Sequence, residues 1–426
     1  MMSETIKNEL TEVQQMFLVV MKNALTGEQT QFDSDVTAQD AVSLLVLASK
    51  QNVLPMVYES VYRNEVFSEL PASDAKFFKN QVFSIVMRQV RKTSEFLTLY
   101  KHFEENGLKP LVVKGIICRN LYPDPDSRPS GDEDLYVPED LFEASQKVLE
   151  DEGMQVAKHI SEVAEHLYEI PYYNNKGTLL IELHKGLFDE EDAYSGMNEL
   201  FYGVFDEAVT VTVMGQEICT MPPTKHMLFL VLHAYKHFLS GGFGLRQVCD
   251  MAMFANAYGS EINWDQLFAL CESVHGDVFA RSLFEICIQY LGMDTERARY
   301  KEEYREKAQD PVDLLKDILD AGIFGGADID RKHSSTMTIK AVGDDRSGEN
   351  VSKQKLLLKT AFPSKEAMMI RYPYVKKHPY LLPVAWSDRL IKYFFSGSHS
   401  SDSAKHSVEI GYERIELLKK YGIIKK

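Results

Sequence analysis

Cysteine is scarce in this sequence and forms no recognisable pattern. The 426 residues include only Cys118, Cys219, Cys249, Cys271 and Cys287. These five are odd in number, lie far apart and include no C-x-x-C pair. Their arrangement excludes a disulfide-stabilised scaffold and a cysteine-rich zinc site.

The chain also lacks a long apolar run. No stretch approaches the roughly 18–20 apolar residues that a membrane-spanning helix requires. Residues 1–7 have neither the basic start nor the apolar core of a signal peptide. We therefore expect a soluble, cytoplasmic protein.

Positive charge is in deficit. There are 47 lysines and arginines against 63 aspartates and glutamates, a formal net charge of −16. An acidic surface repels phosphate backbones, so we expect no broad binding of nucleic acid, although a local basic pocket for a nucleotide is compatible with this balance. The hydrophobic share of 45% and the charged share of 26% are typical of globular proteins, and the length suits two or three domains.

Helical patterns at both ends of the chain enclose a short segment with strand patterns. Apolar residues recur at three- and four-residue steps from Phe83 to Phe103, which predicts an amphipathic helix that ends at Gly107. The predicted fold is α+β, with a small mixed sheet and flanking helices. We expect an N-terminal helical region (1–104), an α/β core (105–221), a helical domain (222–321), a mobile connection (322–355) and a C-terminal helical extension (356–426).

The core alternates strands and helices. Its predicted elements are a strand at 110–113, a loop at 122–131, a strand at 132–137, a helix at 139–151 and a hairpin of 168–173 with 178–184. Further helices are predicted at 227–238, 246–258, 264–274 and 278–291. Residues 396–403 have the composition of a flexible linker. For the aromatic-rich segment 368–386 we favour packing on the core over a membrane interface or a partner surface.

The most informative feature is an acidic pair on the second predicted strand. Side chains alternate across a strand, so Asp132 and Asp134 project to one face and Glu133 to the other. Two neighbouring carboxylates repel each other unless a cation lies between them. Carboxylate oxygens suit Mg²⁺ or Mn²⁺, so the pair predicts a site for such an ion; a solvated turn is the alternative.

The hairpin supplies a third acid, Glu182. If its strand pairs beside the strand of Asp132 and Asp134, the three carboxylates form a cluster that can hold two divalent ions about 3.5–4 Å apart, as used in phosphoryl and nucleotidyl transfer. Alternatively, Glu182 forms a cross-strand ion pair. His184 lies on the same strand face and either contacts a phosphate or is a hydrogen-bonded core histidine.

Candidate phosphate ligands lie nearby in the sequence. Lys114 and Gly115 stand where a strand turns into a short helix, whose N–H groups together with the lysine suit a phosphate. Arg128 and Ser130 precede the acids and are predicted to hold phosphate oxygens. On the helix at 227–238, either Lys236 or His237 lies near a triphosphate or the helix face only packs; zinc is disfavoured because H-E-x-x-H is absent.

These motifs resemble a known family. Lys114-Gly115, the run from Arg128 to Val137 and Glu182-Leu183-His184, with the helical stretches 233–237 and 244–250, are similar to the bacterial "uncharacterised nucleotidyltransferase" family of the polymerase-beta-like nucleotidyltransferase superfamily. The resemblance extends from the N-terminal helices to beyond residue 260. In place of the superfamily's usual Gly-Ser, this chain has Lys114-Gly115.

The resemblance implies a polymerase-beta-like core and a Mg²⁺-dependent (or Mn²⁺-dependent) transfer of a nucleoside monophosphate from an NTP. The metal-binding and catalytic positions would be Asp132, Asp134 and Glu182, and the acceptor an unidentified hydroxyl on a small molecule or a protein. Two alternatives stand beside this hypothesis. One is a non-catalytic nucleotide- or partner-binding module of the same fold, and the other is a kinase-like phosphotransferase that uses the same metal site.

Overall fold

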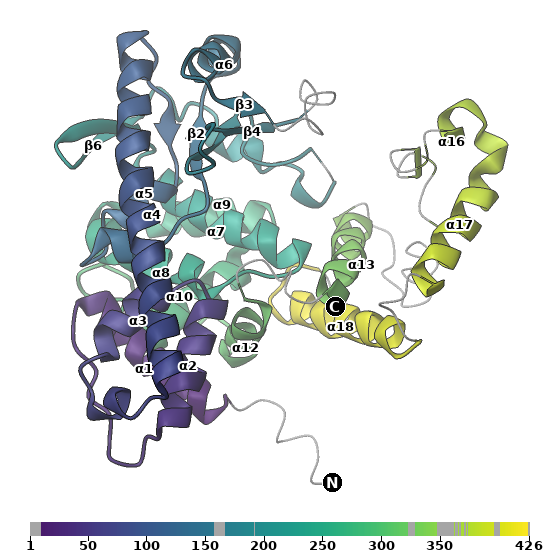
Figure 1. The fold of residues 1–426 in the computed structure, drawn as a ribbon. Coiled ribbons are helices and arrows are strands. Elements are labelled where there is room, and N and C mark those ends of the chain that lie inside the picture. Colours follow the sequence, from purple (N-terminus) through teal and green to yellow (C-terminus); the bar gives the residue numbers. More distant parts are fainter. Residues whose placement is uncertain are drawn as a thin grey trace.

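A small sheet lies among many helices in the computed structural model (Figure 1). The structure describes residues 10–156, 167–190, 192–322, 329–346, 362, 365, 368–369, 372, 374–395 and 401–424. The fold is mixed α and β, with 62% helix and a mixed sheet of five strands, which confirms the predicted fold class at that level. No helix within the described part of the chain is both long and apolar enough to span a membrane.

Among the described residues, four α-helices and one 3₁₀-helix come before the sheet. The first two begin with capping boxes, in which Thr11 and Thr37 each accept a hydrogen bond from the backbone three residues on, because a free N–H at a helix start needs a partner. The predicted helix around 83–103 is part of a 34-residue helix that ends before Gly107, which has φ +76°. The elements are α1 (Glu12–Thr26), α2 (Ala38–Lys50), α3 (Leu54–Val61), η2 (Glu65–Ser68) and α4 (Ala72–Glu105).

The five strands form one sheet in the order β1-β2-β5-β4-β3. The pair β2–β5 is parallel and the other pairs are antiparallel. The elements of this region are β1 (Leu111–Val112), α5 (Gly115–Arg119), η3 (Pro125–Ser127), β2 (Glu133–Tyr136), η4 (Glu139–Leu141), α6 (Phe142–Asp151), β3 (Gln155–Val156), β4 (Glu169–Tyr173) and β5 (Leu180–His184).

The predicted hairpin is confirmed as β4 and β5. Asn174 holds its turn, because its side-chain oxygen accepts from the backbone N–H of Thr178 and its own carbonyl from that of Gly177, which has φ +65°. The side chains of β5 alternate between the two faces of the sheet. Ile181 and Leu183 are buried in the same apolar cluster as residues of α4, so the alternate residues of β5 face the opposite side of the sheet.

The helical domain covers that opposite side. Helix α7 lies against it, as shown by a hydrogen bond between Lys114 and His233 and an ion pair between Lys236 and Glu169. The four helices predicted after residue 226 are confirmed. The elements are η6 (Asp192–Tyr194), η7 (Asn198–Phe201), β6 (Val209–Val213), β7 (Gln216–Thr220), α7 (Pro223–Ser240), α8 (Leu245–Tyr258), η8 (Gly259–Glu261), α9 (Trp264–Ser273), α10 (Asp277–Tyr290), α11 (Glu302–Arg305) and α12 (Val312–Ala321).

The C-terminal region differs in part from the prediction. The expected mobile connection contains helix α13 (Ile329–Arg346), whose Thr338 hydroxyl donates to the carbonyl of Leu239 on α7. Side chains of α13 and of α18 (Ser401–Lys420) join the main core, so tertiary packing forms a helix where the periodicity is weak. Residues 323–328 and 347–355 of that connection, and 396–400 of the expected linker, lie outside the described residues.

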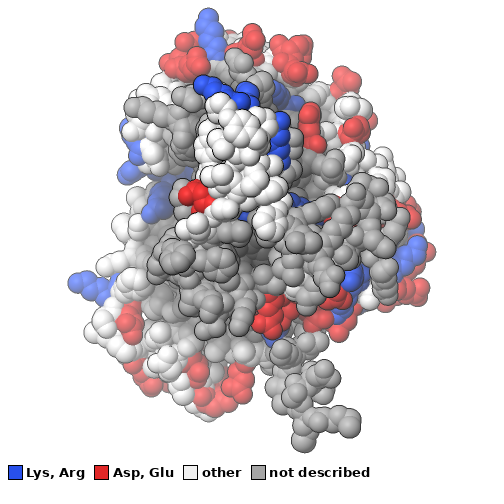
Figure 2. Space-filling model, turned by 90° about the vertical axis from the view of Figure 1, so that its right-hand side faces the viewer, with Lys and Arg blue, Asp and Glu red and all other residues white. Residues whose placement is uncertain are grey.

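The aromatic-rich segment does not merge with the main core as we favoured. Its buried residues, among them Met368, Tyr372, Val375 and Ala385, form a small apolar cluster of their own. Figure 1 shows its helices standing apart from the sheet, and Figure 2, which views the molecule from that side, shows largely uncharged side chains in the foreground. The elements are α16 (Tyr374–Lys377), η9 (Pro379–Leu381) and α17 (Leu382–Phe395).

Candidate functional site

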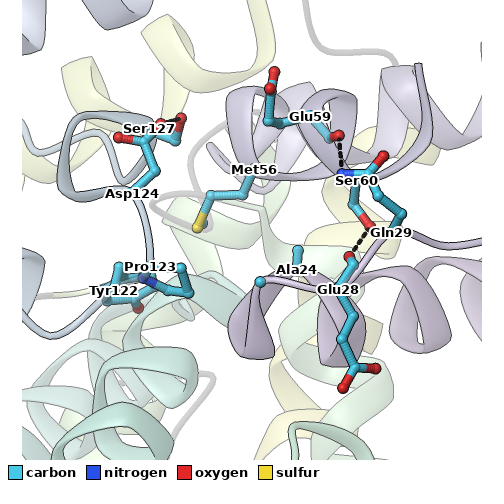
Figure 3. Close-up of a pocket in the computed structure, with 11 residues that line it drawn as sticks. Ala24, Glu28, Gln29, Met56, Glu59, Ser60, Tyr122, Pro123, Asp124 and Ser127 are labelled. Atoms are coloured by element: carbon cyan, nitrogen blue, oxygen red, sulfur yellow. Dashed lines mark hydrogen bonds between the residues drawn. The ribbon is translucent and has the colours of Figure 1, made fainter. Parts of the chain in front are cut away.

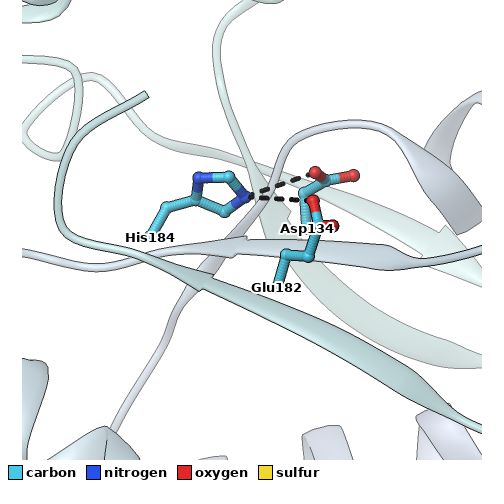
Figure 4. A group of neighbouring side chains, drawn as sticks. All are labelled: Asp134, Glu182 and His184. Atoms are coloured by element: carbon cyan, nitrogen blue, oxygen red, sulfur yellow. Dashed lines mark hydrogen bonds and ion pairs between the residues drawn. The ribbon is translucent and has the colours of Figure 1, made fainter. Parts of the chain in front are cut away.

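The parallel pair β2–β5 brings two distant acids together. In its register Asp134 lies opposite Glu182, and Tyr136 lies opposite His184. His184 Nε2 is 3.3 Å from Asp134 Oδ1 and 3.9 Å from Glu182 Oε2 (Figure 4). One ligand atom from each of these three residues lies within 4.8 Å of the other two. Two carboxylates and one imidazole thus converge on a single point.

The three side chains differ in exposure. Asp134 is 1% exposed and His184 4%, whereas Glu182 is 25% exposed. The group therefore has a buried floor formed by Asp134 and His184, and Glu182 faces solvent. An ion bound here would keep part of its coordination shell open to a ligand from outside.

The electrostatics show that negative charge is in excess. Burial raises the pKa of Glu182, and repulsion from Asp134 and Asp132 raises it further, to about 8. Burial alone would also raise the pKa of Asp134, but Lys114 and His184 hold it well below its usual range. One of the two facing carboxylates is thus ionised and the other tends to keep its proton, which is the behaviour of acids that share too few cations.

The donor set fits a divalent cation. Carboxylate oxygens suit Mg²⁺ and Mn²⁺, and imidazole nitrogen is a common ligand of transition metals. Asp134, Glu182 and His184 are the residues that would hold such an ion. Its charge would relieve the repulsion that raises the pKa of Glu182.

Asp132 lies beside this group and outside it. It precedes β2, and its carboxylate is 3.9 Å from the Lys114 ammonium. Lys114 Nζ is also 3.0 Å from Asp134 Oδ2. The three predicted acids are therefore neighbours, and Lys114 lies between two of them.

The start of α5 is already occupied by a carboxylate. Glu133 Oε2 accepts from the backbone N–H of Ile116 at 2.7 Å. A Cβ on Gly115 would lie 1.8 Å from that oxygen, and Gly115 has φ +39°, so only glycine fits. Glu133 thus accepts the hydrogen bond that was predicted to hold a phosphate here, and phosphate binding by Gly115 stays a prediction.

Glu133 belongs to a buried network of its own. Its carboxylate accepts from Arg119 at 3.0 Å and from the Ser130 hydroxyl at 3.2 Å, and it is 3.3 Å from the Lys92 ammonium. Burial would raise its pKa, but Lys92 and Arg119 lower it to about 2. This structural role of Glu133 was not predicted from the sequence. The signal for it is the alternation of side chains along a strand, which turns Glu133 to the face opposite Asp132 and Asp134. Ser130 holds the network, which argues against its predicted role as a phosphate ligand.

Arg128 is committed to a second buried acid. Its Nε donates to Asp250 on α8 at 3.0 Å, its Nη2 pairs with the same carboxylate, and the Tyr122 hydroxyl donates there at 2.7 Å. The Arg128 side chain is 2% exposed. The prediction that Arg128 binds phosphate therefore finds no support, because its donors join the loop to the helical domain.

Helix α7 places basic groups above the acids. Lys236 Nζ donates to the Tyr168 hydroxyl at 2.6 Å and is 3.7 Å from Glu169. His237 Nε2 is 3.3 Å from His233 Nε2, which is in turn 3.3 Å from Lys114 Nζ. Burial lowers the pKa of His237 to about 3, helped by Lys236 and Lys114. Tyr168 and Glu169 were not predicted as site residues; Tyr168 directly precedes β4 and Glu169 is its first residue, opposite His184.

A separate pocket of about 170 Å³ lies between α1, α3 and the loop before β2 (Figure 3). Its lining includes Glu28, Glu59 and Asp124 and no lysine or arginine. Its charge therefore disfavours a triphosphate, and we do not assign it to the nucleotide.

The fold and the acid-histidine group define a class: an α+β protein with a candidate metal centre on adjacent strands of a small mixed sheet. The family model described as "Uncharacterised nucleotidyltransferase" matches residues 37–292, more than half of the chain. The chain belongs to this family, which confirms the predicted resemblance. The comparisons with curated proteins and with solved structures found no match.

Proposed function

We propose that this protein transfers a nucleoside monophosphate from an NTP to a hydroxyl acceptor in a reaction that requires Mg²⁺ or Mn²⁺. The observation that supports this most is the register of β2 and β5, which sets Asp134 opposite Glu182. Membership of the nucleotidyltransferase family supports the reaction class.

Each group has a role in this proposal. Asp134, Glu182 and His184 surround the cation site, and Asp132 lies beside it. Bound there, a divalent ion would neutralise phosphate charge and lower the pKa of the attacking hydroxyl. The triphosphate would lie between the acids and α7, within reach of Lys236, His237 and Lys114. Arg128, Ser130 and the Gly115 backbone are left out, because their polar groups or their surroundings are already occupied.

Glu182 is our candidate for the group that accepts the hydroxyl proton. It is the most exposed of the converging residues, so an acceptor reaches it from solvent. The acidic composition favours a small molecule or a protein as acceptor over a nucleic acid.

The test is to incubate the protein with each labelled NTP, Mg²⁺ and a cell extract, and to find which molecule gains the label. Pyrophosphate as co-product supports the proposal. Nucleoside diphosphate would show a kinase instead. NTP binding without metal and without pyrophosphate would show a binding module.

A double variant sharpens this test. We expect Asp132→Ala with Asp134→Ala to abolish metal-dependent NTP turnover and to lower the melting temperature, because Lys114 then keeps neither of its two carboxylate partners. The matched control is Glu139→Ala with Asp140→Ala, which removes two exposed acids just after the same strand. If both double variants lose turnover equally, the acids at residues 132 and 134 have no special role.

A further inference from the structure

The two oxygens of Asp134 face different partners. Oδ1 is turned toward His184 Nε2 at 3.3 Å, and Oδ2 toward Lys114 Nζ at 3.0 Å. Because Asp134 is 1% exposed, its carboxylate has little freedom to exchange these partners. The site is therefore divided at Asp134 into a histidine side and a lysine side.

The histidine side has the dimensions of one coordination sphere. Two ligands of one small divalent ion lie at most about 4.2 Å apart, twice a bond length of about 2.1 Å. The distances of 3.3 Å from His184 to Asp134 and 3.9 Å from His184 to Glu182 lie within this limit. Both carboxylates thus lie within one coordination sphere of His184, and all three ligand atoms lie within 4.8 Å of one another.

The lysine side is already filled by a cation. Lys114 Nζ has Asp134 at 3.0 Å, His233 Nε2 at 3.3 Å and Asp132 at 3.9 Å around it. His233 is its hydrogen-bond partner, and Asp134 and Asp132 are its two ion-pair partners. The side chain is 13% exposed, and its backbone stands beside Gly115, which has no room for a Cβ.

The formal charges of the site also favour a single divalent ion. The carboxylates of Asp132, Asp134 and Glu182 carry three negative charges when ionised. In the nucleotide-free site, one ammonium and one divalent ion neutralise them, whereas a second divalent ion would leave an excess of positive charge in a part-buried site. A further acid, Glu169, is 3.7 Å from Lys236 Nζ and 3.6 Å from His184 Nδ1.

We propose that this site takes one divalent cation, ligated by Asp134, Glu182 and His184, and that the Lys114 ammonium permanently occupies the place of a second ion between Asp134 and Asp132. This inference deepens the proposed function and rests on it. Lys114 would meet the triphosphate from the position that the second ion holds in a two-ion site, which gives a reason for a lysine before Gly115.

The experiment counts Mn²⁺ ions on the purified full chain by electron paramagnetic resonance, without nucleotide and with a non-hydrolysable NTP analogue. We expect one bound ion per wild-type chain and an uncoupled spectrum in both states. Lys114→Arg keeps the charge and should keep one ion. Lys114→Met removes the charge and should admit a second ion whose spectrum is coupled to the first.

The ligand set has its own readout. Pulsed measurements on the bound Mn²⁺ should show coupling to an imidazole nitrogen. His184→Gln should remove this coupling and weaken Mn²⁺ binding by roughly 10–100-fold or more, the range that loss of a supporting group typically costs. His378→Gln, at an exposed position outside the site, is the matched control, and it should leave the nitrogen coupling unchanged.

Several results would overturn the inference: two coupled ions on the wild type, one ion on every Lys114 variant that folds, a nitrogen coupling that survives His184→Gln, or no bound Mn²⁺ at all. If Lys114→Met does not fold, the number of Mn²⁺ ions on the wild type and the nitrogen coupling of the His184 variant still test the inference. Pyrophosphate release separates the two proposals. Release by a wild type with two ions refutes only the single-ion site, whereas one ion without release under any NTP refutes only the transfer reaction.

Discussion

Two adjacent acids on β2, Glu133 and Asp134, are neutralised in opposite ways. Glu133 faces α4 and α5 and is surrounded by Arg119, Lys92, a hydroxyl and a backbone N–H. Asp134 faces α7 and shares its cations with other acids. Both are buried, so exposure does not distinguish them; the balance of charge around each does.

The difference separates structural from functional use of a buried charge. Around Glu133 positive charge is sufficient, and the pKa falls to about 2, as in a stable ion pair. Around Asp134 and Glu182 it is insufficient, and the pKa of Glu182 rises to about 8. Perturbed acids with a deficit of cations are typical of sites that await a charged ligand.

The largest expected effect lies on the Glu133 side. Glu133→Gln leaves the Arg119 and Lys92 charges buried without a counter-charge, so we expect the free energy of unfolding to fall by about 3–5 kcal/mol. Urea denaturation measures this loss. Glu143→Gln, at an exposed position on α6, is the control and should change stability little. A Glu133 variant that is as stable as the wild type but loses Mn²⁺ binding would reverse the assignment of the two acids.

For Asp134, on the opposite face of β2, we expect substitution to weaken metal binding. Asp134→Asn removes a charged ligand and leaves Lys114 and His184 in place. We expect Mn²⁺ affinity to fall by more than the roughly 10–100-fold that loss of an outer-shell partner costs. Isothermal titration with Mn²⁺ tests this. The comparison fails if Asp134→Asn lowers stability as much as Glu133→Gln and leaves metal affinity intact.

The sequence predicted the features that depend on neighbouring residues and did not predict the contacts between residues that are distant in the sequence. Strand alternation and the Asn174–Gly177 turn are local, so the hairpin and the opposite orientations of Glu133 and Asp134 were predictable. The partners of Glu133 and Arg128 come from helices that are distant in the sequence, such as α4 and α8. An arginine before two acids looks the same whether it binds a phosphate or Asp250. Only the tertiary fold distinguishes the two.

A smaller effect concerns pH. The ordinary pKa of Glu182 is 4.5 and its folded value is about 8, so between these limits the folded chain binds more protons than the unfolded chain. In metal-free buffer, stability should therefore fall as pH rises from about 4.5 to about 8, by less than about 1.4 kcal/mol per pH unit. The raised pKa of His184 acts in the same direction above its ordinary value of 6.5.

Urea midpoints across this range, in chelator and in saturating Mn²⁺, measure the slope. Glu182→Gln should flatten the metal-free slope, and Mn²⁺ should flatten it in the wild type by replacing the missing positive charge. Glu139→Gln, exposed beyond the end of β2, should leave it unchanged. Parallel slopes for wild type and Glu182→Gln would place the excess negative charge elsewhere.

The smallest expected effect concerns Lys236 on α7, which faces the acids from the other wall. Its side chain is 19% exposed and already has partners in Tyr168 and Glu169. A hydrogen bond to a charged group contributes about 1.5–3 kcal/mol when buried and less when solvent shares the site, so Lys236→Ala should raise the KM for NTP roughly tenfold. The kcat should change less, because the acids stay in place.

Tyr168→Phe removes the lysine's neutral partner and keeps its charge, so a KM near the wild-type value there would assign the effect to charge. If Lys236→Ala lowers kcat and leaves KM unchanged, Lys236 acts on the transition state. The groups that take part in the reaction would then include a residue of α7 as well as the acids of β2 and β5.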